Sequence, residues 1–212
     1  MPIHPETGLS APAMLQRRAI LHPEATAITY LKTDDVQERL TYGNLDRQAR
    51  GIAAWLLTNG CKGQRAILIY PAGLDFIAAF FGCLYACVTP VPCVSRLRPR
   101  NTQTLGAIAA NCEATLALTD SHTLQQIVDS AATRRGLRWV ASDTIAPADN
   151  ADRFPDVDVG DLAFLQYTSG STAFPRGVRV SHRNLSHHLG ALAASYRINH
   201  LSYKRTRDIY GM

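Results

Sequence analysis

A run of small hydroxyl residues interrupted by glycine is the part of this sequence best suited to chemistry. Its members are Thr168, Ser169, Gly170, Ser171 and Thr172. Phosphate oxygens need several short donors converging on one point, and such a loop supplies backbone N–H groups with hydroxyls beside them. Because Gly170 has no Cβ, the backbone can come close to a bound group. The run therefore predicts a phosphate-binding loop.

Two residues beyond the run strengthen this prediction. Arg176 adds a permanent positive charge with a forked donor set that suits a phosphate, and Gly177 frees the chain to re-enter a strand over Val178 to Val180. Together these elements suit a nucleoside triphosphate. A flexible surface turn is the competing interpretation of a Ser-, Thr- and Gly-rich stretch. The order of residues matches neither the Gly-x4-Gly-Lys-Ser/Thr phosphate loop nor the three-glycine dinucleotide fingerprint.

Three histidines at the start of a predicted helix are the next candidates. His182, His187 and His188 follow Ser181, which can cap that helix, and they are separated by steps of five and one. A metal site would need two of them on one helix face, as at a four-residue spacing, backed by a carboxylate. We therefore predict no metal site, and we expect His182 to pack and hydrogen-bond near the phosphate loop.

The composition is that of an ordinary soluble globular protein. The 212 residues are 46% hydrophobic and 18% charged, enough for a core in one domain or at most two. A net charge of +5 permits acidic partners, but only Trp139 and Tyr203 lie beside basic clusters, so no nucleic-acid partner is predicted. The longest apolar stretch, Phe76 to Val88, is shorter than the roughly 20 residues that cross a bilayer, and no secretory signal is apparent. We expect a cytoplasmic protein with no membrane span.

The cysteines suggest neither a disulfide framework nor a zinc site. Their number is odd and no two have the paired two-residue spacing of zinc ligands. They are Cys61, Cys83, Cys87, Cys93 and Cys112. Reduced, mostly buried thiols are expected.

Hydrophobic periodicity predicts alternating helices and strands. Helices are expected over Ala13–Leu21, from the cap Thr41 to Asn59-Gly60, and over Leu74–Cys87, Thr102–Ala110 and Ser121–Thr133. Strands are expected over Ala25–Leu31, up to Leu40, and over Ala66–Tyr70, Thr89–Cys93, Thr115–Thr119, Leu137–Ala141 and Leu162–Tyr167. The first two strands are expected to form a hairpin, Ser95–Arg100 a loop, and 143–161 a surface connection.

The strand-helix-strand order predicts an α/β fold with a mostly parallel sheet flanked by helices. The residues around the phosphate loop also resemble a known signature. The string YTSGSTAFPRGVRVSHRNL, residues 167–185, is similar to that of the adenylate-forming superfamily of acyl-CoA synthetases, luciferases and peptide-synthetase adenylation domains. In that signature a Thr-Ser-Gly-Ser/Thr-Thr run precedes Pro-Lys-Gly-Val and a Ser/Thr-His that opens a helix.

Two further segments narrow the resemblance. LTYGNLDRQARGIAAWLL, residues 40–57, resembles an early helix of the superfamily. LIYPAGLDFIAAFFGCLYACVTPVPC, residues 68–93, closely resembles the counterpart in fatty acyl-AMP ligases, as does Gln166 before the loop. The resemblance implies that residues 1–196 are an incomplete portion of the large N-terminal AMP-binding (adenylation) domain, followed by a divergent tail over 197–212.

The resemblance also implies a reaction. A fatty acid carboxylate attacks the α-phosphate of ATP with Mg²⁺ present, giving acyl-AMP and pyrophosphate, and the acyl group passes to an acyl carrier protein in lipid or polyketide assembly. Coenzyme A is the alternative acceptor. Thr168, Ser169, Gly170, Ser171 and Thr172 are implied to cradle the β- and γ-phosphates, with Arg176 in the position of the family lysine and Gly177 after it.

Other family motifs are not found in these 212 residues. They are a Tyr-Gly-x-Thr-Glu motif, a ribose-binding aspartate and the catalytic lysine of a small C-terminal domain. No catalytic residue is therefore assigned, and the expectation is a truncated ligase that is inactive alone. The alternatives are an acyl-CoA synthetase fragment, and a non-catalytic or split-half module that pairs with a separate chain.

Overall fold

A four-stranded parallel sheet forms the centre of the structure, a computed structural model that describes residues 8–32, 37–93, 99–128, 136–149, 154–168 and 175–195. The strand order is β4-β3-β5-β6. The strands are Arg65–Ile69 (β3), Thr89–Cys93 (β4), Leu116–Thr119 (β5) and Arg138–Ala141 (β6). The predicted α/β fold with a mostly parallel sheet is confirmed.

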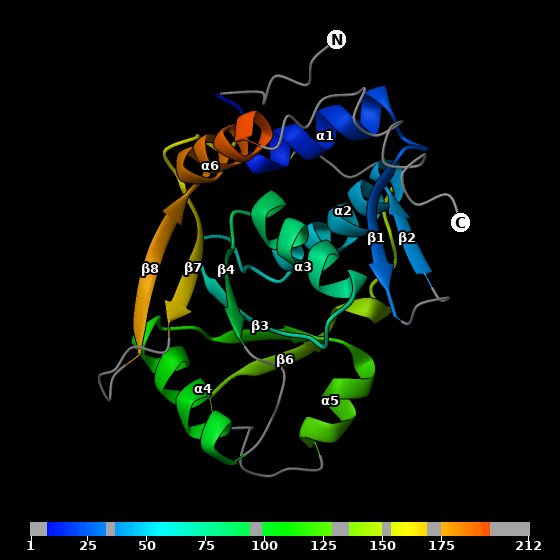
Figure 1. The fold of residues 1–212 in the computed structure, drawn as a ribbon. Helices are drawn as coiled ribbons and strands as arrows, with labels where there is room; N and C mark the ends of the chain where they lie inside the picture. Colours follow the sequence, from blue (N-terminus) through cyan, green and yellow to red (C-terminus); the bar gives the residue numbers. More distant parts are fainter. Residues whose placement is uncertain are drawn as a thin grey trace.

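Helices cover both faces of this sheet (Figure 1). The chain steps from β3 outward to β4 through α3 (Leu74–Tyr85), then back across β3 to β5 through α4 (Pro99–Asn111). Because parallel crossovers are right-handed, the reversal of direction puts α3 and α4 on opposite faces. Leu68 therefore packs with α2 (Tyr42–Thr58) and α3, whereas its neighbour Ile67 packs with α4. Helix α5 (Ser121–Val128) lies on the α4 side in Figure 1.

Helix α2 has the ends that its sequence predicts. The Thr41 hydroxyl accepts a hydrogen bond from the Asn44 N–H at 3.2 Å, and the helix ends before Asn59. Gly60 then takes a left-handed φ of 69°. The apolar residues at three- and four-residue steps are all buried, namely Leu45, Ala49, Ile52 and Leu56.

A buried polar network joins α2 to α3. Asp46 of α2 accepts a hydrogen bond from the Tyr85 hydroxyl at 2.7 Å and pairs with Arg50 at 2.6 Å. The Tyr85 ring also packs against Phe154, with ring centroids 5.3 Å apart. The charge of Asp46 is thus compensated by one guanidinium and one hydroxyl, which a buried carboxylate requires.

The N-terminal elements follow the predicted pattern with small shifts. Helix α1 (Ala11–Leu21) begins before the expected Ala13, because Pro12 fits the first turn of a helix, where its missing N–H has no partner to lose. Strands β1 (Thr26–Leu31) and β2 (Gln37–Thr41) pair antiparallel, so the expected hairpin is confirmed.

Two predicted boundaries were wrong. Pro99 and Arg100, expected in a loop, open α4, since proline is well tolerated at the first helical position. Helix α3 stops at Tyr85 rather than Cys87, because Cys87 has a left-handed φ of 52° that a helix cannot contain. The end of the predicted helix Ser121–Thr133, beyond Val128, lies outside the described residues. A short 3-10 turn, η1 (Ser142–Thr144), starts the connection that follows β6.

Strand β4 is the edge of the parallel sheet and carries two prolines. The Thr89 N–H donates to the Gln64 carbonyl at 2.9 Å, so Thr89, Val91 and Cys93 present their N–H groups to β3. The positions of Pro90 and Pro92 alternate with these and face outward. Proline has no N–H, so the outer edge of β4 lacks the donors of a normal ladder at both positions.

A separate antiparallel ribbon lies beside that edge (Figure 1). It consists of β7 (Leu162–Thr168) and β8 (Arg176–Ser181), and it leads into α6 (His182–Ser195), which lies next to α1. Strand β7 contacts β4, but the two belong to different sheets. The ribbon therefore rests against the parallel sheet through side chains such as Leu165 and Tyr167.

Candidate functional site

The candidate phosphate site lies at one end of the β7–β8 ribbon. Thr168 and Arg176 are the last register partners, directly before and after residues 169–174. The structure thus describes Thr168, Arg176 and Gly177 and brings them together at one end of the ribbon. The other predicted site residues, Ser169, Gly170, Ser171 and Thr172, lie outside the described residues.

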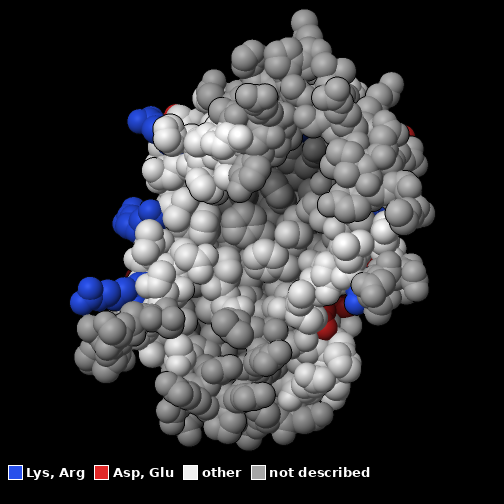
Figure 2. Space-filling view, in the orientation of Figure 1, with Lys and Arg blue, Asp and Glu red and all other residues white. Residues whose placement is uncertain are grey.

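Positive charge gathers on the same strand. The side chains of Arg176, Arg179 and the following Arg183 are exposed, and none forms an ion pair with a residue that the structure describes. Figure 2 shows Lys and Arg side chains along the edge where β8 lies in Figure 1. Arg176 is thus available to an anion bound between the two strand ends.

Gly177 is required for a reason that the sequence did not reveal. It pairs with Tyr167 across the ribbon, and a Cβ built on Gly177 would lie 2.9 Å from Cζ of the Tyr167 ring. That distance is shorter than real Cβ contacts. The φ of Gly177 is outside the left-handed region, so the position needs the absence of a side chain rather than conformational freedom.

Tyr167 also connects the ribbon to α4. Its hydroxyl donates a hydrogen bond to Oδ1 of Asn111, the last residue of α4. Burial and the neighbouring Cys112 raise the pKa of Tyr167 above its usual value, so the phenol stays neutral and keeps its proton for this bond. The roles of Tyr167 and Asn111 depend on a contact between distant segments, which no local pattern in the sequence indicates.

His182 is not near the phosphate loop, and this prediction was wrong. Leu162 pairs with Ser181 and Thr168 with Arg176, so His182 lies at the opposite end of the ribbon, roughly 20 Å away at about 3.4 Å per residue. Its Nδ1 accepts a hydrogen bond from the Ala11 N–H at 3.3 Å. Burial lowers the pKa of His182, against an opposing effect of Asp161. His182 therefore fixes α1 to the ribbon as a neutral side chain.

Ser181 caps α6 as predicted. Its hydroxyl accepts a hydrogen bond from the Asn184 N–H at 3.2 Å, and the Asn184 side chain accepts one in return from the Ser181 N–H at 3.0 Å. This reciprocal arrangement satisfies backbone donors at the helix start.

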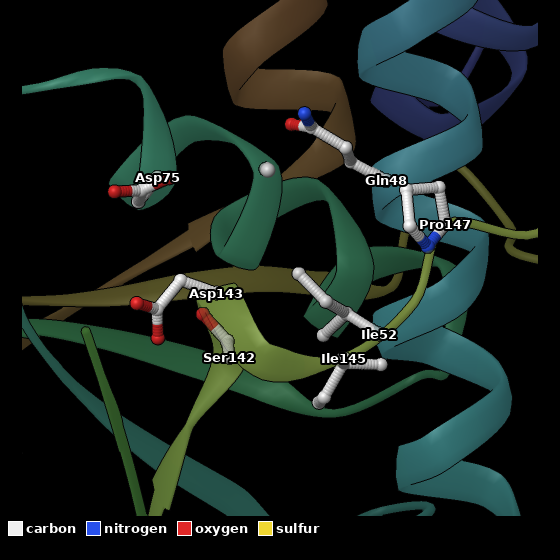
Figure 3. Close-up of a pocket in the computed structure, with 8 residues that line it drawn as sticks. Gln48, Ile52, Asp75, Ser142, Asp143, Ile145 and Pro147 are labelled. Carbon is white, nitrogen blue, oxygen red and sulfur yellow. The ribbon is translucent and has the colours of Figure 1, made fainter. Parts of the chain in front are cut away.

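A small acidic pocket lies at the carboxyl end of the parallel sheet (Figure 3). Asp75 opens α3 after β3, and Asp143 follows β6; together with Gln48 and Ser142 they line a space of about 110 Å³. No role was predicted for these carboxylates from the sequence. A signal for this cluster was present in the sequence, where an aspartate follows soon after each of several predicted strands. The carboxyl ends of parallel strands meet at one edge of a sheet, so these aspartates are brought together there.

The carboxylates around this pocket serve neighbouring helices. Asp143 accepts hydrogen bonds from the N–H and the hydroxyl of Ser121 at 2.8 and 2.6 Å, and Asp120 accepts one from the Thr123 N–H at 2.8 Å, so both cap α5. Burial, then Asp143 and Asp120, raise the pKa of Asp75. A space of about 110 Å³ is too small for a nucleotide, so the pocket is a structural feature of the sheet edge.

Two larger grooves run along α1 and α2. They have volumes of about 500 and 700 Å³, and both are lined by Ile20 and Arg50. Because Arg50 is already paired with the buried Asp46, its charge is not free to select an anionic ligand. Arg47 also lines one groove, and it pairs with Asp149 at 3.3 Å. Both arginines of these grooves therefore have a carboxylate partner, whereas Arg176 has none among the described residues.

The state of the cysteines agrees with the expectation of reduced, mostly buried thiols. All five cysteines are free; Cys61, Cys83 and Cys112 are buried, and the other two are half-buried, which confirms the expectation of mostly buried thiols. Burial raises the pKa of Cys93 to about 12.

Among the helices that the structure describes, none is both long enough and apolar enough to span a bilayer.

The chain resembles enzymes that activate fatty acids. It is 38% identical over 188 residues to the medium-chain-fatty-acid–[acyl-carrier-protein] ligase JamA of Moorena producens (strain JHB), covering 82% of this chain and 31% of JamA. It is 30% identical over 200 residues to the long-chain-fatty-acid–AMP ligase FadD23 of Mycobacterium tuberculosis (strain CDC 1551 / Oshkosh), covering 89% of this chain and 34% of that protein. The chain thus spans about a third of the length of these curated relatives.

The fold is also similar to that of a solved fatty acid AMP ligase. The crystal structure of the fatty acid AMP ligase from Legionella pneumophila superimposes with a TM-score of 0.82 at 31% identity, covering 90% of this chain and 33% of that one. The model of the AMP-binding enzyme family matches residues 15–210. With the ribbon and its loop inside the matched segment, the chain belongs to the AMP-binding enzyme family.

Proposed function

We propose that this chain is the phosphate-binding part of an ATP-dependent ligase that activates a fatty acid as its acyl-adenylate. The relatives named above support a fatty acid as the substrate. The observation that carries the proposal is the register pair of Thr168 and Arg176, at the two strand ends that flank residues 169–174. It holds a hydroxyl beside a guanidinium that forms no ion pair with the described residues.

In the proposed reaction a carboxylate oxygen of the fatty acid forms a bond to the α-phosphorus of ATP. The bond from this phosphorus to the oxygen that bridges to the β-phosphate breaks, and pyrophosphate leaves with the electron pair. Thr168, Ser169, Ser171 and Thr172 would donate to the β- and γ-phosphates, with Gly170 admitting close approach. Arg176 would neutralise the charge on the departing pyrophosphate, a role of positioning and electrostatic stabilisation.

The acceptor that we propose is the phosphopantetheine thiol of an acyl carrier protein, by analogy with the name of JamA. We propose that Mg²⁺ enters with ATP, on its phosphates, because Mg²⁺ in such sites is held mainly by the phosphates and by one or two carboxylates. Within the described ranges no group of three or more His, Cys, Asp or Glu side chains is arranged to hold a metal ion. A cytoplasmic location is part of the same proposal.

Calorimetric titration of the 212-residue chain with ATP tests the phosphate site. R176A should weaken binding roughly tenfold or more, because it removes a charge-assisted hydrogen bond. R176K should retain more affinity than R176A, since it keeps the charge but not the fork. R179A is the matched control on the same strand and should change the affinity by less than about twofold at physiological salt. Equal losses in R176A and R179A would contradict the specific role of Arg176.

The activity is tested in a longer protein, because the curated relatives are about three times as long as the matched segment. Residues 8–195 are transplanted into the Legionella fatty acid AMP ligase in place of the corresponding segment. ATP-pyrophosphate exchange with medium- and long-chain fatty acids should persist in the transplant and should fall when Arg176 is replaced by alanine. Exchange that is independent of fatty acid would contradict the proposed substrate.

A further inference from the structure

We propose that Tyr167 is a positioning residue for the phosphate loop, acting through Gly177 and Asn111. The inference rests on the proposed function for the ligand that the loop takes, but the way in which this end of the ribbon is held can be tested without a ligand. It assigns a role to two residues, Tyr167 and Asn111, that are not among the predicted phosphate ligands.

The ribbon needs such a residue because the parallel sheet does not hold it by a ladder. Strands β4 and β7 are in contact but belong to different sheets, and Pro90 and Pro92 remove donors from the outer edge of β4. Side-chain contacts must therefore set the place of the ribbon. This differs from a phosphate loop that follows a central strand, where backbone hydrogen bonds on both sides fix the start of the loop.

Tyr167 contacts both strands of the ribbon one register pair before the loop. It belongs to β7, and its ring lies over Gly177 of β8, whose missing side chain it replaces. The same ring packs against the core between the sheet and α4, which includes Val91, Leu105 and Ile108. A movement of this ring would therefore move both strands that carry the loop.

The hydroxyl of Tyr167 adds a fixed point outside the ribbon. It donates to Asn111 at the end of α4, and this helix end is itself well held. The Ala114 N–H donates to the Ala109 carbonyl at 2.9 Å, and Glu113 takes a left-handed φ of 53° that directs the chain into β5. Asn111 is thus tied to a strand at the centre of the sheet.

The opposite end of the ribbon has its own tie, from Ala11 to His182. One end of the ribbon is thus linked to α4 through Asn111, and the other end is linked to α1 through His182. The end with Tyr167 carries Thr168 and Arg176, and phosphate binding by several donors depends on their convergence within fractions of an ångström. Loss of the Tyr167–Asn111 bond should therefore loosen the loop end and leave the His182 end in place.

Four variants and one control test this inference in the 212-residue chain. Y167F keeps the ring over Gly177 but removes the donor, and N111L removes the acceptor. Each should weaken ATP binding about fivefold, the effect of one net hydrogen bond, and the double variant should be no weaker than either single one. N111D keeps an acceptor and should recover part of the affinity that N111L loses, because its added negative charge repels ATP. Y30F, a hydroxyl deletion in β1 on the other side of the molecule, is the matched control.

Hydrogen–deuterium exchange supplies a readout that does not depend on ATP. In Y167F the backbone amides of residues 167, 168 and 176–178 should exchange about five times faster, with those near Ser181 unchanged. Equal acceleration along the whole ribbon would indicate a purely structural role and overturn the inference, as would unchanged exchange. If the unmodified chain binds no ATP while the local acceleration is seen, the proposed function fails and the positioning role of Tyr167 stands.

Discussion

The ring of Tyr167 occupies the space that a side chain at residue 177 would fill. Besides the approach to Cζ, a Cβ at Gly177 would lie 3.1 Å from Cε2 and 3.2 Å from the hydroxyl oxygen of Tyr167. Two ring atoms and the hydroxyl oxygen thus block one methyl group. An aromatic ring over a glycine on the neighbouring strand is a known way to stabilise such a position in a sheet.

The first prediction follows from this contact. G177A should destabilise the chain by about 1–3 kcal/mol, the usual cost of forcing an extra group into a packed site. Urea denaturation followed by circular dichroism measures the difference. G106A is the matched control, because nothing lies within 4 Å of a Cβ at Gly106 in α4. It should stabilise the chain by about 0.5–1 kcal/mol. A loss in both variants would argue against the ring contact.

The second prediction concerns His182 and pH. Its folded pKa is lowered from 6.5, so the folded state binds fewer protons than the unfolded state around that pH. Stability from this residue is present above about pH 6.5 and is lost as pH falls through the lower folded pKa. Thermal unfolding between pH 7 and 5 should show this decline in the unmodified chain and a weaker one in H182N. H187N, at an exposed histidine of the same helix, should keep the decline.

The third prediction has the opposite sign and concerns Asp75. Its folded pKa is raised from 3.8 by burial and by Asp143 and Asp120. Protonation is therefore favoured in the folded state, and the stability from this carboxyl decreases as pH rises from about 3.8 through the raised pKa.

D75N should accordingly be more stable than the unmodified chain at pH 7, by less than about 1 kcal/mol because solvent screens this exposed charge. The difference should vanish near pH 3. Melting temperatures at both pH values check this, with D156N at an exposed position as the control. A D75N variant that is less stable at pH 7 would show that the favourable effect of the α3 N-terminus outweighs the repulsion.

The fourth prediction concerns the buried pair of Asp46 and Tyr85. Y85F removes the hydroxyl that donates to the Asp46 carboxylate at 2.7 Å and leaves one oxygen of a buried charge without that partner. The free energy of unfolding should fall by about 1.5–3 kcal/mol. Equilibrium urea unfolding measures it, and Y30F should change it by less than about 0.5 kcal/mol. A loss as small as that of Y30F would mean that Arg50 alone compensates Asp46.

The fold could be predicted from sequence where local signals agreed. Helix α2 had a capping Thr41, apolar residues at helical spacing and a closing Asn59-Gly60, and its ends were correct. The boundary at Pro99 was wrong because proline signals both a break and a helix start, and the sequence does not say which. Cys87 ended α3 early through a left-handed conformation that no local residue preference indicates.

Phosphate binding by residues 168–177 stays a prediction from composition, and the contacts that hold this end of the ribbon could not be predicted from sequence. The type and order of the residues from Thr168 to Gly177 indicated phosphate binding without knowledge of the fold. The location of His182 depended on the direction of β8, which places it at the far end of the ribbon. The contact of Tyr167 with Asn111 joins residues 56 positions apart, and such a pair arises only from packing.

The two prolines of β4 also bear on how the chain folds. Before the ribbon docks, the outer edge of β4 would be open, and an open edge can pair with the same edge of another molecule. Pro90 and Pro92 face that edge without N–H groups, so a second copy cannot extend the ladder there. The residues that keep the ribbon separate from the sheet should therefore also protect the partly folded chain from edge-to-edge aggregation.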